Sequence, residues 1–191
     1  ILYGFTNSCG AGYLECARII NSLLVVLALP FIYLVARRVA TRGVAIWVAG
    51  ISILGPINTY TAYFMPEAMY FFGFWVFLWI ALKGRGRSWL VYSVAVGISL
   101  ALLSLVKAHA VFLLAAVGLF EVLLRREEGW KVAIRNASRI LLGSVIVFLT
   151  VRFGLGYLIA GVKGLSILGS DYSSIGLSTK GEIATYLFLL F

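Results

Sequence analysis

Five ionisable side chains stand within or beside long apolar runs of the sequence: Arg18, Glu67, Lys107, His109 and Arg152. Charged groups are costly in hydrocarbon, and those found there usually face the interior of a helix bundle and take part in function. A lysine offers a point charge to a phosphate, and a histidine offers a hydrogen-bond donor or a proton carrier. Together these side chains are typical of a site for an anionic ligand.

The same side chains also have structural interpretations. Lys107 could extend its amine to the membrane surface, and Arg18 could be an interfacial anchor. Arg152 lies about 18 Å along its predicted helix from Ile140, so it needs either a lipid phosphate or an acidic partner such as Glu67. Glu67 could bind a metal, orient a sugar hydroxyl, pair with Lys107 or stabilise the first turn of its own helix. The residue types alone leave these alternatives open.

The composition indicates the environment that must position these residues. Of the 191 residues, 62% are hydrophobic and 12% are charged, and the mean hydropathy is +1.04. An average soluble domain is about 45–50% apolar and about 25% charged. A soluble core of this size could not enclose so much apolar surface, which excludes soluble, disordered, fibrous and nucleic-acid-binding proteins. The remaining class is an all-α, polytopic transmembrane helical bundle.

Apolar runs of suitable length predict six complete spans and a truncated seventh, since a membrane helix needs about 20 apolar residues. These spans are Ile19–Ala36, Val44–Ile57, Glu67–Leu82, Trp89–Leu105, Ala110–Leu124, Ile140–Ala160 and a run from Ile183. The domains are then an extracytoplasmic segment at 1–18, the bundle at 19–160, an extracytoplasmic loop at 161–182 and the start of a further helix at 183–191. Because the chain begins without methionine and ends within an apolar run, we expect it to be part of a longer protein.

The distribution of cations predicts the orientation. Eleven of the 16 lysines and arginines fall in three connectors between alternate spans, namely Arg37, Arg38, Arg42, Lys83, Arg85, Arg87, Arg125, Arg126, Lys131, Arg135 and Arg139. The positive-inside rule makes that side cytoplasmic. The protein would therefore be multi-pass in the cell (inner) membrane, or in the endoplasmic reticulum membrane of a eukaryote, with its site facing outside. Cys9 and Cys16 lie on the outer side, where their spacing permits but does not require a disulfide.

Three predicted spans, the second, third and fifth, are shorter than the hydrocarbon core, which is roughly 30 Å thick. Because cations fix their cytoplasmic ends, the shortfall falls on the outer side. Non-helical backbone is tolerated there only beside protein or a wet cavity. We expect a cavity open to the outer leaflet, with tilting and thinning of the bilayer as the alternative.

Short motifs of the sequence resemble those of one family of membrane enzymes. Leu14–Leu23, with Arg18 and a following serine, and then Tyr33–Arg38 resemble the Arg…Ser…Y-x-x-A-R-R stretch of GT-C glycosyltransferases, in the branch of protein O-mannosyltransferases and bacterial aminoarabinose transferases. Met65–Met69 looks like that family's (R/M)-P-(D/E)-x-(L/M) segment. Leu105–His109 looks like its L-(T/L)-K-x-x turn, with valine in the second place.

The resemblance implies a glycosyltransferase that moves a sugar from a polyprenyl-phosphate donor to a lipid, glycan or protein acceptor on the extracytoplasmic face. It implies that Lys107 approaches the donor phosphate and that Glu67 lies near the donor or a divalent metal, the one candidate cofactor. We add His109, Arg152 and Arg18 as candidate phosphate ligands. The family's general base is an aspartate in an outer loop with no counterpart here, so no catalytic residue is assigned and we expect the base to precede the chain or to be lost. Membrane lipids are the other expected partners.

Two other functions share part of this pattern. A transporter or lipid flippase for an anionic substrate also uses charges in the membrane and interrupted helices. Such proteins often contain inverted repeats, and the predicted spans show no convincing internal symmetry. A purely structural membrane subunit predicts instead that Lys107 and Arg152 can be neutralised without loss of function.

Overall fold

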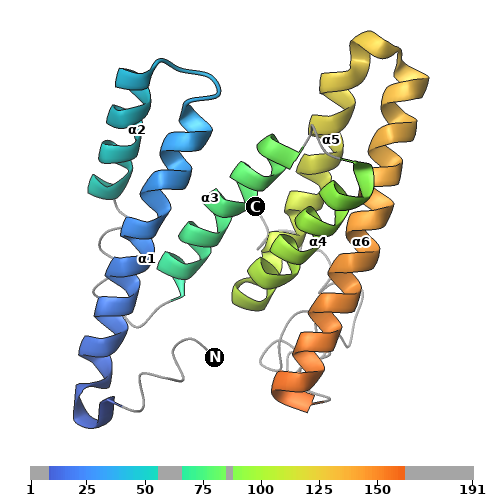
Figure 1. Cartoon of the computed structure of the whole chain (residues 1–191). Coiled ribbons are helices and arrows are strands. Elements are labelled where there is room, and N and C mark those ends of the chain that lie inside the picture. Colours follow the sequence, from blue (N-terminus) through green and yellow to red (C-terminus); the bar gives the residue numbers. More distant parts are fainter. Residues whose placement is uncertain (1–8, 56–65, 85–87, 162–191) are drawn as a thin grey trace, which may run out of the picture. The chain divides into compact units, whose positions relative to one another are not determined.

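The computed structural model describes residues 9–55, 66–84 and 88–161, which are helical and contain no strand (Figure 1). The helices are α1 (Tyr13–Ala36), α2 (Arg42–Leu54), α3 (Glu67–Lys83), α4 (Trp89–Val106), α5 (Leu113–Arg125) and α6 (Trp130–Ala160), with short 3-10 helices η4 (Ala108–Phe112) and η5 (Arg126–Glu128). The chain divides into two units, Ile1–Arg152 and Phe153–Phe191. The all-α class predicted from composition is confirmed for these residues.

Within the described residues, four helical segments are long and apolar enough to cross a membrane: Cys9–Ala36, Trp89–Val106, Ala108–Glu128 and Trp130–Ile159. They contain most of the first, fourth, fifth and sixth predicted spans. The other two helices, α2 with 13 residues and α3 with 17, are shorter. The run predicted from Ile183 lies outside the described residues, as does the loop at 161–182 after its first residue.

Three helical segments extend beyond the membrane spans predicted from hydropathy. Helix α1 begins at Tyr13 rather than Ile19, and α6 begins at Trp130 rather than Ile140. The fifth predicted span is extended at both ends by 3-10 turns, so it is not short. Charged residues were assigned to loops, whereas lysine, arginine and glutamate are good helix formers and continue a helix beyond its apolar part.

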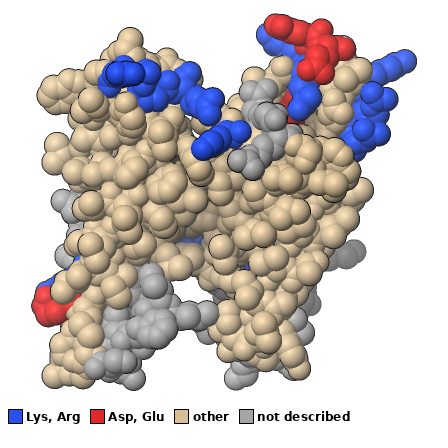
Figure 2. Space-filling model, in the orientation of Figure 1, with Lys and Arg blue, Asp and Glu red and all other residues tan. Residues whose placement is uncertain are grey.

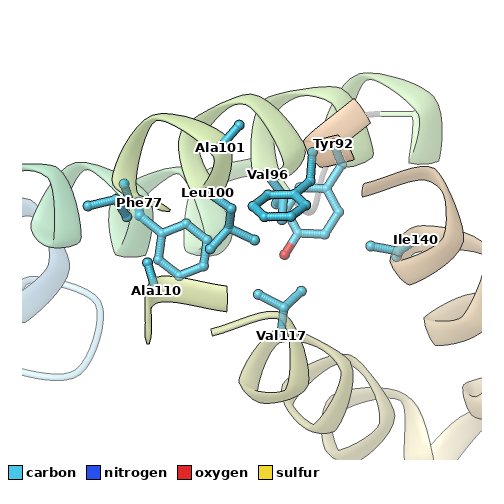
Figure 3. Close-up of a cluster of buried hydrophobic side chains, with 10 residues drawn as sticks. Phe77, Tyr92, Val96, Leu100, Ala101, Ala110, Val117 and Ile140 are labelled. Carbon is cyan, nitrogen blue, oxygen red and sulfur yellow. The ribbon is translucent and has the colours of Figure 1, made fainter. Parts of the chain in front are cut away.

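One buried hydrophobic cluster joins α3, α4, α5 and α6 (Figure 3). Phe77 of α3, Leu100 of α4, Val117 of α5 and Ile140 of α6 all belong to it. Ala110 of η4 lies in the same cluster and is fully buried. The turn between α4 and η4 therefore lies beside this core.

Helices α4 and α6 approach closely through small residues, here called the α4–α6 contact: Ser93, Gly97, Gly143 and Ser144. A Cβ atom on Gly97 would lie 2.7 Å from the carbonyl oxygen of Ser144, and one on Gly143 would lie 2.9 Å from Cβ of Ser93. The Ser93 hydroxyl donates to the carbonyl of Ile140 over 3.2 Å, and the Ser144 hydroxyl donates to the carbonyl of Ser93 over 3.3 Å. Small residues and hydroxyl bonds between helices are typical of helix pairs in membranes.

The exteriors of these helices are apolar. Exposed large side chains include Ile46 and Trp47 of α2, Leu119 of α5 and Leu142 of α6. Figure 2 shows lysine and arginine side chains gathered over the α1–α2 and α5–α6 connections, and residues other than Lys, Arg, Asp and Glu cover most of the rest of this face. Extended apolar surface of this kind is typical of contact with lipid or with other membrane helices.

Candidate functional site

Glu67 and Lys107 lie at the same end of the pair formed by α3 and α4, Glu67 at the start of α3 and Lys107 after the end of α4. Glu67 is the first residue of α3, whose last residue is Lys83, and Lys107 directly follows the end of α4. Helices of 17 and 18 residues are about 26 Å long, so both side chains lie that far along their helices from the cation-rich α3–α4 connection. The prediction that they share one end of the bundle agrees with this arrangement.

The two side chains form an ion pair. Lys107 Nζ donates to Glu67 Oε1 over 2.7 Å across 40 positions of sequence. The exposed fractions of the two side chains are 27% and 22%, so the pair is sheltered from most of the solvent. A pair in lower effective dielectric interacts more strongly than one on a fully exposed surface. Of the alternatives for Glu67, two are observed: it pairs with Lys107, and it lies in the first turn of its own helix.

A break in the helix positions Lys107. Helix α4 ends at Val106, and Lys107 adopts extended backbone angles (φ −141°, ψ 122°) before η4 starts at Ala108. The Lys107 N–H still donates to the carbonyl of Leu103, and its carbonyl accepts from the N–H of Ala110. The tight turn predicted over this segment is confirmed, and it is held on both sides by backbone hydrogen bonds.

Glu67 is positioned by the start of its helix. Pro66 occupies the N-cap position of α3, and the next residue after Glu67, Ala68, is fully buried. The carboxylate therefore lies at the positive end of the helix dipole, which stabilises its charge. Its second oxygen, Oε2, is enclosed and has no hydrogen-bond partner in the described part of the chain. A carboxylate accepts several hydrogen bonds, so Glu67 retains capacity to accept one more.

Two rings complete what we call the α3–η4 cluster: Glu67, Tyr70, Lys107 and His109. The Tyr70 and His109 rings meet edge to face, with centroids 5.4 Å apart, and Lys107 Nζ lies 6.0 Å from the Tyr70 centroid. His109 is exposed, whereas Tyr70 also packs against the buried core. Tyr70 was not predicted. Its position three residues after Glu67, on the same helix face, was the available signal.

The remaining predicted residues lie elsewhere. Arg18 on α1 donates to Glu15 over 2.8 Å, and both side chains are exposed. Arg152 on α6 is buried, with 7% of the residue exposed. The role of each as a phosphate ligand stays a prediction.

Cys9 and Cys16, whose spacing permits a disulfide without requiring one, are joined by a disulfide at the start of α1. It lies at the opposite end of α1 from Arg37 and Arg38. A disulfide forms in an oxidising compartment, whereas clustered cations mark the cytoplasmic end of a membrane helix. The direction in which this helix crosses the membrane stays a prediction.

The α3–η4 cluster does not by itself form a metal site. Among the described residues, no group of three or more histidine, cysteine, aspartate or glutamate side chains could hold a metal ion. Within the cluster, only Glu67 and His109 have side chains of these types, and Lys107 already occupies one oxygen of the carboxylate. The residues described here do not fit the divalent metal that the resemblance implied.

One groove among the described residues lies away from this cluster. It is a shallow, apolar groove between α1 and α2, lined by residues that include Leu29, Tyr33, Ile46 and Gly50. The cavity expected near Lys107 stays a prediction.

Comparisons of the chain with models of known protein families, with curated proteins and with solved structures found no match.

Proposed function

We propose that this chain belongs to an integral-membrane glycosyltransferase and that the α3–η4 cluster holds the phosphate of a polyprenyl-phosphate-sugar donor. The ion pair between Lys107 and Glu67 is the observation that carries the proposal. Paired charges in apolar surroundings lose much of their mutual attraction to desolvation, so they are weak evidence for stability. Charged groups held at membrane depth are instead typical of ligand sites.

The proposed topology has six complete spans and a seventh, with α2 and α3 crossing as short helices. The cation-rich connectors face the cytoplasm, and the Cys9–Cys16 disulfide faces the opposite compartment. Because α1, α2 and α3 alternate in direction, the N-terminus of α3 would lie on the disulfide side. Glu67 and Lys107 would then face the compartment in which polyprenyl-phosphate sugars are used.

The chemistry assigned to the cluster is electrostatic. When the sugar leaves its lipid carrier, negative charge grows on the departing phosphate oxygen. A fixed cation in a water-poor site stabilises that charge more strongly than water does. Lys107 is the cation, and Glu67 fixes the amine in place until the donor arrives. The acceptor hydroxyl needs a separate general base, and no residue of the cluster is assigned that role.

The order of the short motifs also supports the proposal. Tyr33–Arg38, Met65–Met69 and Leu105–His109 resemble GT-C segments and follow one another in the same order. The residues that these segments contribute, Glu67 and Lys107, are those that meet in the ion pair. Two motifs that are far apart in sequence thus each supply one partner of the ion pair.

The test is sugar transfer by the complete protein in lipid nanodiscs, supplied with a polyprenyl-phosphate hexose and membrane acceptors. Lys107→Gln should lower the rate about 100-fold or more, as loss of one transition-state donor does elsewhere. Lys83→Gln, at the other end of the α3–α4 hairpin, is the matched control and should leave the rate unchanged. An unchanged rate with Lys107→Gln would overturn the proposal. Movement of the lipid between leaflets without sugar transfer would assign a flippase instead.

A further inference from the structure

We propose that Glu67 is an exchangeable counter-ion that makes the site prefer the sugar-bearing donor lipid over the bare polyprenyl phosphate that remains after transfer. This inference rests on the proposed function and adds a residue that sets specificity and promotes product release. It follows from three features of the cluster: the ion pair, the unpartnered oxygen and the charges of the two lipids.

The first feature is that Lys107 is already neutralised. Its amine lies 2.7 Å from Glu67 Oε1, so an incoming phosphate must share or replace that carboxylate. The carboxylate stays close by in either case, since it begins α3 and its neighbour Ala68 is fully buried. Two like charges within a few ångströms repel strongly in a sheltered site.

The second feature is Glu67 Oε2, which is enclosed and lacks a hydrogen-bond donor in the described part of the chain. An enclosed acceptor without a donor is energetically costly, and the cost is removed when a donor binds. A sugar attached to the phosphate carries several hydroxyl groups and can supply that donor when the Glu67 carboxylate rotates toward the bound lipid. Bare polyprenyl phosphate carries no hydroxyl group other than its own acidic one.

The third feature is the charge of the ligands. A phosphate monoester such as bare polyprenyl phosphate carries a charge of about −1.5 to −2 at pH 7. The sugar-linked diester carries a single negative charge. A lone lysine would therefore hold the product more tightly than the donor. Beside Glu67 the order reverses, because repulsion is greater for the product and only the donor offers a hydroxyl to Oε2.

The experiment measures equilibrium binding to the complete protein in neutral-lipid nanodiscs, at one pH and one salt concentration. The probes are a short polyprenyl phosphate and the same lipid carrying one hexose. The wild-type protein should bind the hexose-bearing lipid about tenfold or more tightly than the bare lipid. Glu67→Gln should bind the bare lipid about tenfold more tightly than the wild type does, so that the preference disappears.

Two further variants separate this effect from simple damage. Glu67→Ala removes the carboxylate without adding an amide donor and should also strengthen binding of the bare lipid. Glu128→Gln removes a carboxylate that lies 4.0 Å from Arg125 at the other end of α5, and it should change neither affinity. Thermal unfolding of each variant checks that the comparison is made on folded protein.

Equal binding of the two lipids by the wild type would overturn the inference, as would weaker binding of both by Glu67→Gln and Glu67→Ala. Either result leaves the proposed function standing if Lys107→Gln still abolishes sugar transfer. If Lys107→Gln leaves the rate of sugar transfer unchanged, the proposed function fails as well. The two claims are thus tested by different variants.

Discussion

The α3–η4 cluster and the α4–α6 contact lie on neighbouring helices but use polar groups in opposite ways. In the α4–α6 contact, each serine hydroxyl bonds a carbonyl of the other helix, and glycine leaves no spare space. In the cluster, a charged pair is only partly enclosed and one carboxylate oxygen has no partner among the described residues.

Complete satisfaction is typical of a region that holds the fold together, because buried polar groups without partners are costly. An enclosed polar atom without a partner is costly, and a catalytic role or a bound water or ion is a common explanation for one. We therefore expect changes in the α4–α6 contact to alter stability, and changes in the cluster to alter binding more than stability. The predictions below test that separation, beginning with the largest expected effect on stability.

The largest effect should come from Gly97→Ala. The added methyl group would meet the Ser144 carbonyl oxygen and Cβ of Val147, each at 2.7 Å, and neither can move without shifting α6. Overpacking of this kind costs about 2–3 kcal/mol. Reversible unfolding in mixed detergent would measure the loss.

The matched control is Gly50→Ala on α2, where an added Cβ meets nothing within 4 Å. There the better helix propensity of alanine should raise stability by about 0.5–1 kcal/mol. A destabilised Gly97→Ala protein that is still folded should retain lipid binding. Equal effects of the two substitutions would show that α4 and α6 are not in close contact.

A double-mutant cycle on the ion pair should give an intermediate effect. Lys107→Gln or Glu67→Gln alone leaves one charge without its partner and should lower the free energy of unfolding by about 1–2 kcal/mol, because the pair is sheltered but not fully buried. The double variant should recover most of that loss.

Stability and binding should separate in this double variant. It should unfold like the wild type, yet it should not bind the anionic lipid, since the cation is gone. A double variant as unstable as the sum of the two single variants would mean that the residues do not interact. Lys107 and Glu67 would then not form a stabilising ion pair in the protein without ligand.

Contacts between residues one turn apart on the same helix could be predicted from the sequence. Glu121 and Arg125 are four residues apart, the spacing at which opposite charges pair on a helix, and Nε of Arg125 donates to Oε2 of Glu121 over 3.3 Å. The turn before Ala110 was equally predictable, because two apolar runs are interrupted there by Lys107 and His109. Local geometry decides such features.

Features set by the packing of two helices could not be predicted. Glu67 had four plausible roles in the sequence, and the choice of Lys107 as its partner depends on how α3 and α4 pack. Tyr70 was missed because its meeting with His109 depends on the same packing. Helix starts at Tyr13 and Trp130 were missed for another reason, since hydropathy locates the membrane rather than the helix.

The smallest effect should come from Ser93→Ala in the α4–α6 contact. Its hydroxyl donates to the Ile140 carbonyl on α6, and hydrogen bonds between membrane helices contribute about 0.6 kcal/mol on average. Ser99→Ala is the matched control on the same helix, because Ser99 donates to Val96 within α4 rather than across to α6. Unfolding in mixed detergent should show a loss of about 0.6 kcal/mol for Ser93→Ala and a smaller change for Ser99→Ala. If the two losses are equal, shape rather than hydrogen bonding holds α4 against α6. The α4–α6 contact would then differ from the α3–η4 cluster in its close packing at Gly97 and Gly143, and not in its hydrogen bonds.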